Sequence, residues 1–126
     1  TVCDYAGVPI PAELRGHSLR SIVETCQGKP LREFVVTETE FGEFTNTPPF
    51  QHVGPTGRMV RTLKHKYVVY SEGALREQLF DLENDPGEMA NLAVTSKHRD
   101  VLNAHRRMLR DWAAETKDDF PRIEPT

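Results

Sequence analysis

The sequence predicts an α+β fold: a small antiparallel sheet of about four strands, covered by a C-terminal helix and preceded by short helical segments. Between residues 33 and 82, four runs rich in β-branched and aromatic residues are separated by short links, which is typical of strands in an antiparallel sheet. Between residues 97 and 115, apolar residues recur at the helical period, so one side of a helix can cover one face of that sheet.

The first 30 residues predict two short helices. Residues 1–7 carry apolar side chains at helical spacing, Gly7 suits the left-handed position that ends a helix, and Pro9 prevents its continuation. Ser18 is a suitable N-cap for a second helix over residues 18–24. Because the first helix has an end but hardly any beginning, we expect the chain to come from a longer protein.

Four strands are predicted, over residues 33–38, 58–63, 66–70 and 76–82. The second and third are close enough to form a hairpin with its turn around Lys64-His65. The segment Phe41–Gly57 holds three glycines and three prolines without periodicity, so it is predicted to be a long irregular loop. Compact domains rarely keep such a loop unless it is functional or disordered.

Two further helices are predicted after the sheet. Asp85 can cap a helix, Pro86 fits its first position, and Glu88 stands where a side chain reaches back to the cap. The final helix is predicted from about Lys97 to Glu115. Its apolar face should cover one side of the sheet; this face contains Val101, Leu102, Met108, Leu109 and Trp112.

Composition excludes several classes of protein. The formal net charge is −3, which argues against a nucleic-acid binder, since phosphate neutralisation requires clustered Lys and Arg. No apolar run approaches the roughly 20 residues that a membrane span requires. No signal peptide is visible at the start of the sequence, so compartment stays open.

No catalytic or metal-binding residue is predicted within the sequence. Alternating acids from Asp81 begin like a calcium-binding loop, but Pro86 replaces the glycine of position 6 and Leu92 replaces the carboxylate of position 12. Cys3 and Cys26 are too far apart for a zinc pair, and are either free thiols or a disulfide. No nucleophile lies in a G-x-S-x-G turn, and no glycine-rich loop precedes a phosphate-binding Lys.

The histidines offer weaker candidates. His105 lies on the apolar face of the last helix and is predicted to be a buried packing residue, whereas His65 is predicted to be solvated in the hairpin turn. His52 lies in the long loop, where substrate contacts are common, with Glu40 and Arg58 close to it in sequence. His52, Glu40 and Arg58 are therefore candidate substrate-binding residues, and an ordinary surface loop is the alternative.

Two motifs carry a resemblance to a known family. Residues 61–67 follow the pattern R-T-x-x-x-K-Y, and residues 79–92 follow L-[FY]-D-L-x-x-D-P-x-E-x-x-N-L. Both patterns resemble the C-terminal region of sulfatases, members of the alkaline phosphatase superfamily. The opening residues 1–8 and Arg15-Gly16-His17 are similar to the end of that family's large α/β domain. The resemblance thus implies two parts: residues 1–30 as the end of the catalytic domain or a connector, and residues 31–126 as the C-terminal subdomain.

The resemblance also implies a reaction whose catalytic residues are missing from this sequence. Sulfatases use a formylglycine made from the Cys or Ser of a C-x-P-x-R or S-x-P-x-R motif, and a divalent metal, usually calcium, in the N-terminal domain. Cys3 precedes Asp-Tyr-Ala and Cys26 precedes Gln-Gly-Lys, so neither cysteine begins that motif. The cofactors implied for the enzyme, calcium and formylglycine, therefore belong to the catalytic domain, and none is expected in this segment.

The expected function is that of a C-terminal subdomain of a sulfatase (sulfuric ester hydrolase), which supports the catalytic domain and forms one wall of the substrate pocket. Its expected partners are that N-terminal domain and, through the enzyme, a sulfate ester. Two alternatives stay open: a stand-alone interaction or assembly module, and part of a phosphate or phosphonate ester hydrolase of the same superfamily. A periplasmic or secreted location is expected only if the full-length protein carries a signal peptide.

Overall fold

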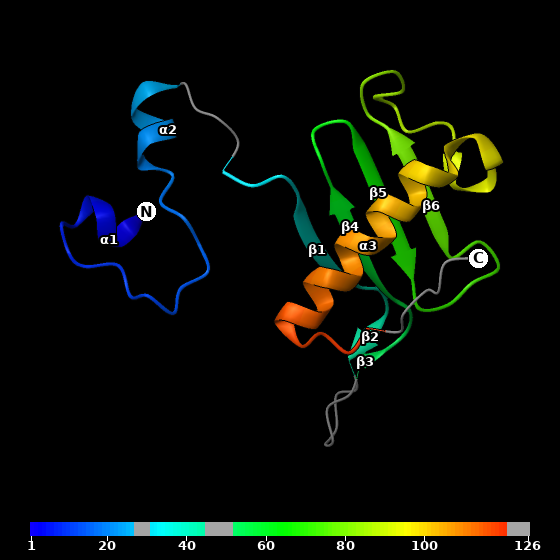
Figure 1. Ribbon diagram of the computed structural model, residues 1–126. Coiled ribbons are helices and arrows are strands. Elements are labelled where there is room, and N and C mark those ends of the chain that lie inside the picture. Colours follow the sequence, from blue (N-terminus) through cyan, green and yellow to red (C-terminus); the bar gives the residue numbers. More distant parts are fainter. Residues whose placement is uncertain (27–30, 45–51, 121–126) are drawn as a thin grey trace. The chain divides into compact units, whose positions relative to one another are not determined.

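The computed structural model describes residues 1–26, 31–44 and 52–120, which belong to two compact units (Figure 1). Unit 1 is Thr1–Glu33 and unit 2 is Phe34–Thr126. The sheet and the long helix lie in unit 2.

A four-stranded antiparallel sheet forms the centre of unit 2, as predicted. Its strand order is β1-β4-β5-β6, so β1 and β6 are the two edges. The strands are β1 (Val35–Glu40), β4 (Thr56–Arg61), β5 (His65–Tyr70) and β6 (Glu77–Asp81). The α+β architecture expected from the sequence is confirmed.

The hairpin between β4 and β5 turns one residue earlier than predicted. Thr62 Oγ1 accepts a hydrogen bond from the His65 backbone N–H at 3.0 Å, which closes the turn before His65. His65 is therefore the first residue of β5, opposite Asp81 of β6, and its side chain is half-buried. The prediction that His65 is solvated within the turn was wrong, because the Thr62 side chain supplies the turn contact.

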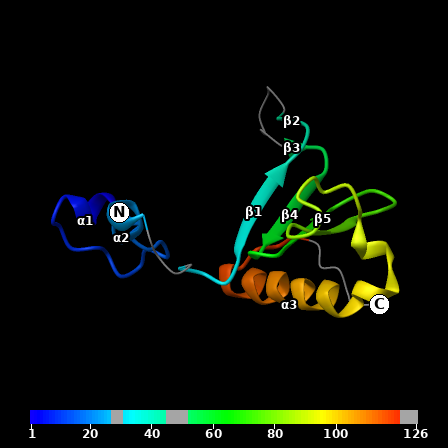
Figure 2. The ribbon, with the colours of Figure 1, turned by 90° about the horizontal axis from the view of Figure 1, so that it is seen from above.

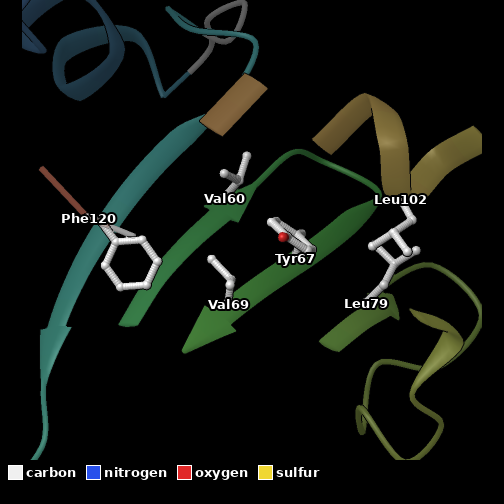
Figure 3. Close-up of a cluster of buried hydrophobic side chains, with 6 residues drawn as sticks. All are labelled: Val60, Tyr67, Val69, Leu79, Leu102 and Phe120. Carbon is white, nitrogen blue, oxygen red and sulfur yellow. The ribbon is translucent and has the colours of Figure 1, made fainter. Parts of the chain in front are cut away.

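Helix α3 (Arg99–Thr116) covers one face of the sheet, close to the predicted range (Figure 2). The core lies between α3 and the sheet and includes the labelled side chains of Figure 3. Val60 and Leu79 have no exposed surface, and complete burial of such side chains stabilises a fold by about 1.5–3 kcal/mol each. The buried apolar residues of this cluster are Val60, Tyr67, Val69, Leu79, Leu102 and Phe120.

The helix predicted from Asp85 does not form. The Asp85 carboxylate accepts the Ala90 backbone N–H at 2.9 Å, five residues on, and Glu88 has a left-handed backbone with φ of 55°. The Asp81 carboxylate likewise accepts the backbone N–H groups of Glu83 and Asn84, both at 3.0 Å. These side-chain bonds compete with helix formation and hold the segment in turns. Two short 3₁₀ helices follow, η1 (Leu92–Val94) and η2 (Ser96–His98).

A small hairpin occupies part of the segment predicted to be an irregular loop. β2 (Glu43–Phe44) pairs with β3 (His52–Val53), and residues 45–51 lie outside the described residues. Gly54 follows β3 with φ of +146°, and a Cβ atom there would lie 2.0 Å from the backbone oxygen of Phe41. Only glycine permits the chain to pass so close to Phe41. The hairpin is thereby fixed to the end of the sheet.

Unit 1 contains two short helices, α1 (Val2–Tyr5) and α2 (Arg20–Thr25), as the sequence predicted. Gly7 takes the expected left-handed conformation, with φ of 68°. Ser18 is not the N-cap, which is Leu19, but its Oγ accepts the Arg20 backbone N–H at 3.2 Å. Cys3 and Cys26 are both free thiols.

Among the described residues, no helix has the length and apolar character that a membrane crossing requires.

Candidate functional site

The three predicted substrate-binding residues lie on or near the β2–β3 hairpin. Glu40 is the last residue of β1 and is exposed, while His52 belongs to β3, where the structure describes the backbone. Arg58 lies on β4, opposite Glu38, whereas Glu40 lies opposite Thr56. Glu40 and Arg58 are therefore one cross-strand step apart on the same face, the face that α3 covers.

Arg58 is buried, with 9% of its surface exposed, and its guanidinium already has several partners. Nε and Nη2 donate to the same oxygen of Asp118, at 3.0 and 2.9 Å, and Nη1 donates to the Gly57 carbonyl at 3.0 Å. The Glu38 carboxylate lies 3.5 Å from Nη2, and the Phe120 ring lies 4.9 Å from the guanidinium carbon. Arg58 thus fastens the residues after α3 to the sheet.

These contacts define what Arg58 can do. Its nearest carboxylate partners are Asp118 and Glu38, so the structure does not pair it with Glu40. A sulfate oxygen could reach this guanidinium only by joining or displacing Asp118. A substrate contact by Arg58, Glu40 or His52 stays a prediction. The role that the contacts of Arg58 support is to hold the residues after α3 against the sheet.

An aromatic pair at the base of the hairpin was not predicted from the sequence. The Phe41 and Tyr70 rings lie 5.8 Å apart, centroid to centroid, at an interplanar angle of 58°. Tyr70 lies over Gly57, where a Cβ atom would come within 3.1 Å of the tyrosine ring. Phe41 and Tyr70 are 29 positions apart, so only the register of β1, β4 and β5 brings them together.

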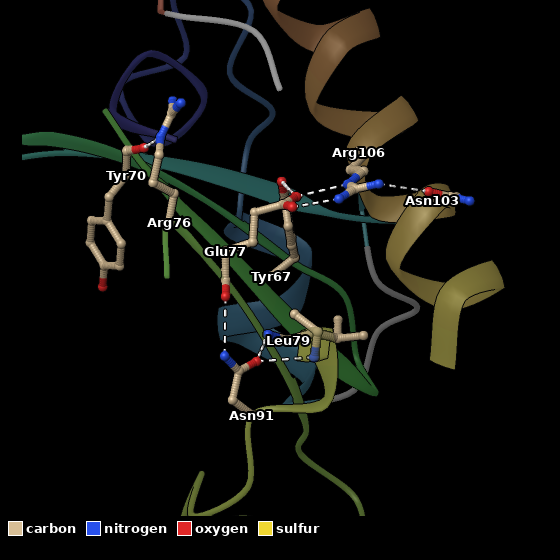
Figure 4. Close-up of polar contacts among 9 residues, drawn as sticks. Tyr67, Tyr70, Arg76, Glu77, Leu79, Asn91, Asn103 and Arg106 are labelled. Carbon is tan, nitrogen blue, oxygen red and sulfur yellow. Dashed lines mark hydrogen bonds and ion pairs between the residues drawn. The ribbon is translucent and has the colours of Figure 1, made fainter. Parts of the chain in front are cut away.

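A polar cluster of Tyr67, Glu77, Asn103 and Arg106 joins α3 to β5 and β6 (Figure 4). Arg106 Nε donates to Glu77 Oε1 at 2.7 Å, and Arg106 Nη2 forms an ion pair with Glu77 Oε2. The Tyr67 hydroxyl donates to Glu77 Oε1 at 2.6 Å, and Arg106 Nη1 donates to the Asn103 side chain at 3.0 Å. Both oxygens of the Glu77 carboxylate are therefore satisfied.

The protonation states of this cluster follow from the same contacts. Burial alone would raise the pKa of Glu77, but hydrogen bonds from Arg106 and Tyr67 outweigh it and hold the pKa below its ordinary value. Burial, and then the hydrogen bond to Glu77, raise the pKa of Tyr67. The cluster consequently contains a carboxylate, a guanidinium and a neutral phenol at neutral pH, an arrangement suited to fixing structure.

Asn91, in the second sulfatase-like motif, links the edge strand β6 to the 3₁₀ helix η1. Its side-chain oxygen accepts the Leu79 backbone N–H and the Ala93 backbone N–H, each at 3.0 Å, while its side-chain nitrogen donates to the Glu77 carbonyl at 3.1 Å (Figure 4). The asparagine therefore pairs with the edge strand β6 as a further strand would, and also caps η1.

A histidine pair lies between α3 and the sheet. His105 is 4% exposed, as predicted for a packing residue, and its Nδ1 lies 2.8 Å from the Val101 carbonyl oxygen. Its ring meets that of His65 edge-on, with centroids 5.6 Å apart, and among the described residues its Nε2 has no hydrogen-bond partner. Burial lowers the pKa of His105, and the neighbouring His65 adds to that effect.

The described residues do not fit a calcium ion. No group of three or more His, Cys, Asp or Glu side chains among them could hold a metal. The acids of the calcium-like segment are already used: Asp81 and Asp85 accept backbone N–H groups, and Glu88 pairs with Lys66.

Comparison with known proteins agrees with the motifs. The family described as "N-sulphoglucosamine sulphohydrolase, C-terminal" matches residues 1–115. The chain is 39% identical over 122 residues to the Delta 4,5-hexuronate-2-O-sulfatase of Bacteroides thetaiotaomicron, covering 95% of this chain and 23% of that protein. It is 36% identical over 96 residues to human Arylsulfatase K, covering 75% of this chain and 17% of that protein. The chain thus spans less than a quarter of either relative.

Solved structures share the fold as well. A structure of a 2-O GAG sulfatase superposes with a TM-score of 0.80 at 36% identity, covering 100% of this chain and 26% of that one. A second structure, holding D-glucosamine-2-N,6-O-disulfate as its substrate, superposes with a TM-score of 0.72; at 21% identity it shows the shared fold alone. Motifs, family match and architecture agree, and the chain belongs to the family of sulfatase C-terminal domains.

Proposed function

We propose that this chain serves as the C-terminal subdomain of an enzyme that hydrolyses sulfuric esters, and that it supports the catalytic domain of that enzyme. The observation that carries the proposal is the family match over residues 1–115, joined to a superposition that covers the whole chain. The chain spans about a quarter of that solved sulfatase, and we assign the bond-breaking chemistry to the remaining part of the enzyme.

The residues present in this chain indicate which part of the enzyme would supply the catalytic groups. A formylglycine nucleophile and a calcium ion, which the sulfatase resemblance implies, are assigned to the catalytic domain. Residues of this chain supply neither the modification motif nor, where the structure describes them, a metal site. No chemical step is therefore assigned to them.

The supporting role rests on the rigidity of unit 2. The Glu77–Arg106 ion pair ties α3 to β6, and the Arg58–Asp118 ion pair ties the residues after α3 to β4. Gly54 holds the β2–β3 hairpin against the end of β1. A rigid sheet that fixes a projecting hairpin suits one wall of a substrate pocket, because sites on well-supported elements hold their geometry.

The substrate class that we propose is a sulfated sugar. The relative at 39% identity is a Delta 4,5-hexuronate-2-O-sulfatase, and the 2-O GAG sulfatase shares the fold at 36% identity. Within this chain, His52, Glu40 and Arg58 are the residues that we propose for the pocket wall. Glu40 is exposed, and its carboxylate can accept hydrogen bonds from sugar hydroxyl groups, while Arg58 is buried and contributes mainly by positioning.

The test compares the full-length enzyme with the 126-residue chain on four substrates: an aryl sulfate, a 2-O-sulfated unsaturated uronate disaccharide, and the phosphate and phosphonate analogues of the aryl ester. We expect the full-length enzyme to release sulfate, with preference for the sugar, and the chain alone to release none even with calcium added. Faster cleavage of the phosphate or phosphonate would assign the other hydrolase class. Absence of any hydrolysis by the full-length protein would favour an interaction module.

A further inference from the structure

The β2–β3 hairpin leaves the sheet at Phe41 and returns to it at Thr56, and both points contact the end of β5 (Figure 1). At the first point, the Phe41 ring lies against the Tyr70 ring. At the second, the Ser71 backbone N–H donates to the Thr56 carbonyl at 2.8 Å, and the Thr56 backbone N–H donates to Ser71 Oγ at 2.9 Å. Two neighbouring residues, Tyr70 and Ser71, therefore hold both ends of the hairpin, and we call them the hairpin anchor.

The position of Tyr70 is itself fixed from two sides. Its backbone N–H donates to the Arg76 carbonyl at 2.9 Å, and Arg76 Nε donates to the Tyr70 carbonyl at 2.8 Å (Figure 4). Gly57 lies opposite Tyr70 on β4, and a Cβ atom there would come within 3.1 Å of the tyrosine ring. Because Gly57 has no side chain, the ring can lie directly on the sheet and support Phe41 from there.

Phe41 carries this contact to the other arm of the hairpin. Its backbone N–H donates to the Pro55 carbonyl at 2.9 Å, and its carbonyl oxygen occupies the space that a side chain at Gly54 would need. Phe41 thus lies between the Tyr70 ring and residues 54–55, which follow β3. Since Phe41 comes directly after Glu40 and β3 begins at His52, the hairpin anchor helps to determine where the backbone of these two candidate pocket residues lies.

The hairpin anchor lies outside the core of unit 2. Val69 belongs to the buried cluster beneath α3, and successive residues of a strand point to opposite faces, so Tyr70 lies on the face of the sheet opposite α3. Tyr70 and Ser71 are half-buried, and Phe41 is 45% exposed. Changes of Tyr70 or Ser71 should therefore affect the position of the hairpin more than the folding of unit 2.

We propose that Tyr70 and Ser71 are positioning residues that set the preference of the enzyme for a sulfated sugar, and that they act through the β2–β3 hairpin. This inference rests on the proposed function, in which His52 and Glu40 belong to the wall of the substrate pocket. A sulfated sugar presents hydroxyl groups to that wall, whereas the ring of a simple aryl sulfate presents none. A displaced hairpin should therefore weaken binding of the sugar and leave turnover of the aryl sulfate unchanged.

Hydrogen–deuterium exchange on the full-length enzyme tests the hairpin anchor independently of activity. In Tyr70→Leu, which keeps an apolar side chain but loses the aromatic contact, the Phe41 amide should exchange about twofold to tenfold faster. In Ser71→Ala, the Thr56 amide loses its acceptor and should also exchange faster. The amides of residues 66–68 in β5 should keep their wild-type rates in both variants. Unchanged exchange of Phe41 and Thr56 would overturn the proposal.

Kinetics of the same variants measures the effect on specificity. Tyr70→Leu and Ser71→Ala should raise KM for the 2-O-sulfated unsaturated uronate disaccharide about twofold to tenfold, with kcat close to the wild-type value and both constants unchanged for the aryl sulfate. Tyr70→Phe keeps the ring and should keep the wild-type KM. Leu75→Ala, a change of a side chain that is 69% exposed between β5 and β6, is the control and should alter neither constant.

The two measurements distinguish the alternatives. Equal losses on the sugar and on the aryl sulfate would overturn the proposal, because they would indicate general damage to the enzyme. A higher KM in Tyr70→Phe would also overturn it, since the hydroxyl group would then contact the substrate directly. Faster exchange with an unchanged KM would separate the hairpin from substrate binding and overturn the role in specificity. A full-length wild-type protein that releases no sulfate would instead refute the proposed function, and the exchange rates would still decide whether Tyr70 and Ser71 hold the hairpin.

Discussion

Arg106 of α3 binds both oxygens of the Glu77 carboxylate on β6, across 29 positions of sequence. Arg106 and Glu77 side chains are 8% and 18% exposed, so the pair is largely removed from water. It joins the helix to the edge of the sheet at the point where Tyr67 adds its hydroxyl. Breaking such a pair leaves one charge buried without a partner.

The first prediction concerns this pair. Arg106→Ala should lower the free energy of unfolding of unit 2 by about 3 kcal/mol, because the Glu77 carboxylate stays behind in a poorly solvated place. Urea denaturation of the chain measures the change. Glu83→Gln is the control, because it removes an ion pair with Lys64 whose side chains are 61% and 68% exposed, and it should cost less than about 1 kcal/mol. Equal losses in both variants would contradict a special role for the buried pair.

The second prediction is a loss of stability in acid that depends on Glu77. The pKa of Glu77 is lowered in the folded state from an ordinary value of 4.5, so the unfolded chain takes up the proton first as pH falls. The stability that Glu77 contributes is present above about pH 4.5 and is lost below it, through the folded pKa. Glu77→Gln should flatten the loss of unfolding free energy in this window. Urea denaturation at several pH values measures it, and an unchanged slope would contradict the assignment.

The third prediction concerns a higher pH window. Burial lowers the pKa of His105 from 6.5, so the unfolded chain binds this proton more readily than the folded chain does. Stability should fall as pH drops below about 6.5, and His105→Leu should remove that step while keeping an apolar side chain against the sheet. The exposed His17, changed to Gln, is the control and should leave the step in place. A step that persists in His105→Leu would assign it to another group.

The fold was predictable to the extent that short-range patterns decide it. Alternation in β6 and the apolar period of α3 depend on neighbours in sequence, and both elements formed close to their predicted bounds. The helix predicted from Asp85 does not form, and the sequence pattern around Asp85 does not reveal the reason. The same carboxylate can cap a helix or close a turn, and the pairing of Glu88 with Lys66 and of Asn91 with β6 accompanies the turn.

The site was less predictable, because its contacts are long-range. His52, Glu40 and Arg58 were selected for their nearness in sequence, yet Arg58 meets Asp118, 60 positions away. Nothing local marks Asp118 as its partner, since Asp119 beside it would serve equally well in the sequence. Phe41 and Tyr70 meet only through strand register. Residue chemistry singled out the loop that contains His52, but only the assembled sheet shows the β2–β3 hairpin within it and the partners that Arg58 already has.

The fourth prediction concerns the base of the hairpin. Gly54→Ala places a methyl group against the Phe41 carbonyl, so β2 and β3 must move away from the end of β1. Gly73→Ala is a matched control, because Gly73 also has a positive φ, +111°, but nothing lies within 4 Å of its Cβ position. Both variants carry backbone strain of about 1–3 kcal/mol, and only the first adds a clash. Thermal unfolding should therefore show a larger loss for Gly54→Ala, and equal losses would contradict the close approach.

The last prediction separates the three candidate pocket residues in the full-length enzyme. Glu40→Gln and His52→Ala should raise KM for a sulfated sugar several-fold with little change in thermal stability, since a pocket wall contributes binding. Arg58→Lys should instead lower the unfolding temperature, because a lysine cannot donate to Asp118 and to the Gly57 carbonyl in the same geometry. Thr37→Ala, an exposed change on the other face of β1, is the control for both readouts. An unaltered KM in the Glu40 and His52 variants would place the hairpin outside the substrate pocket. An unaltered unfolding temperature in Arg58→Lys would show that the contact with Asp118 does not depend on the guanidinium.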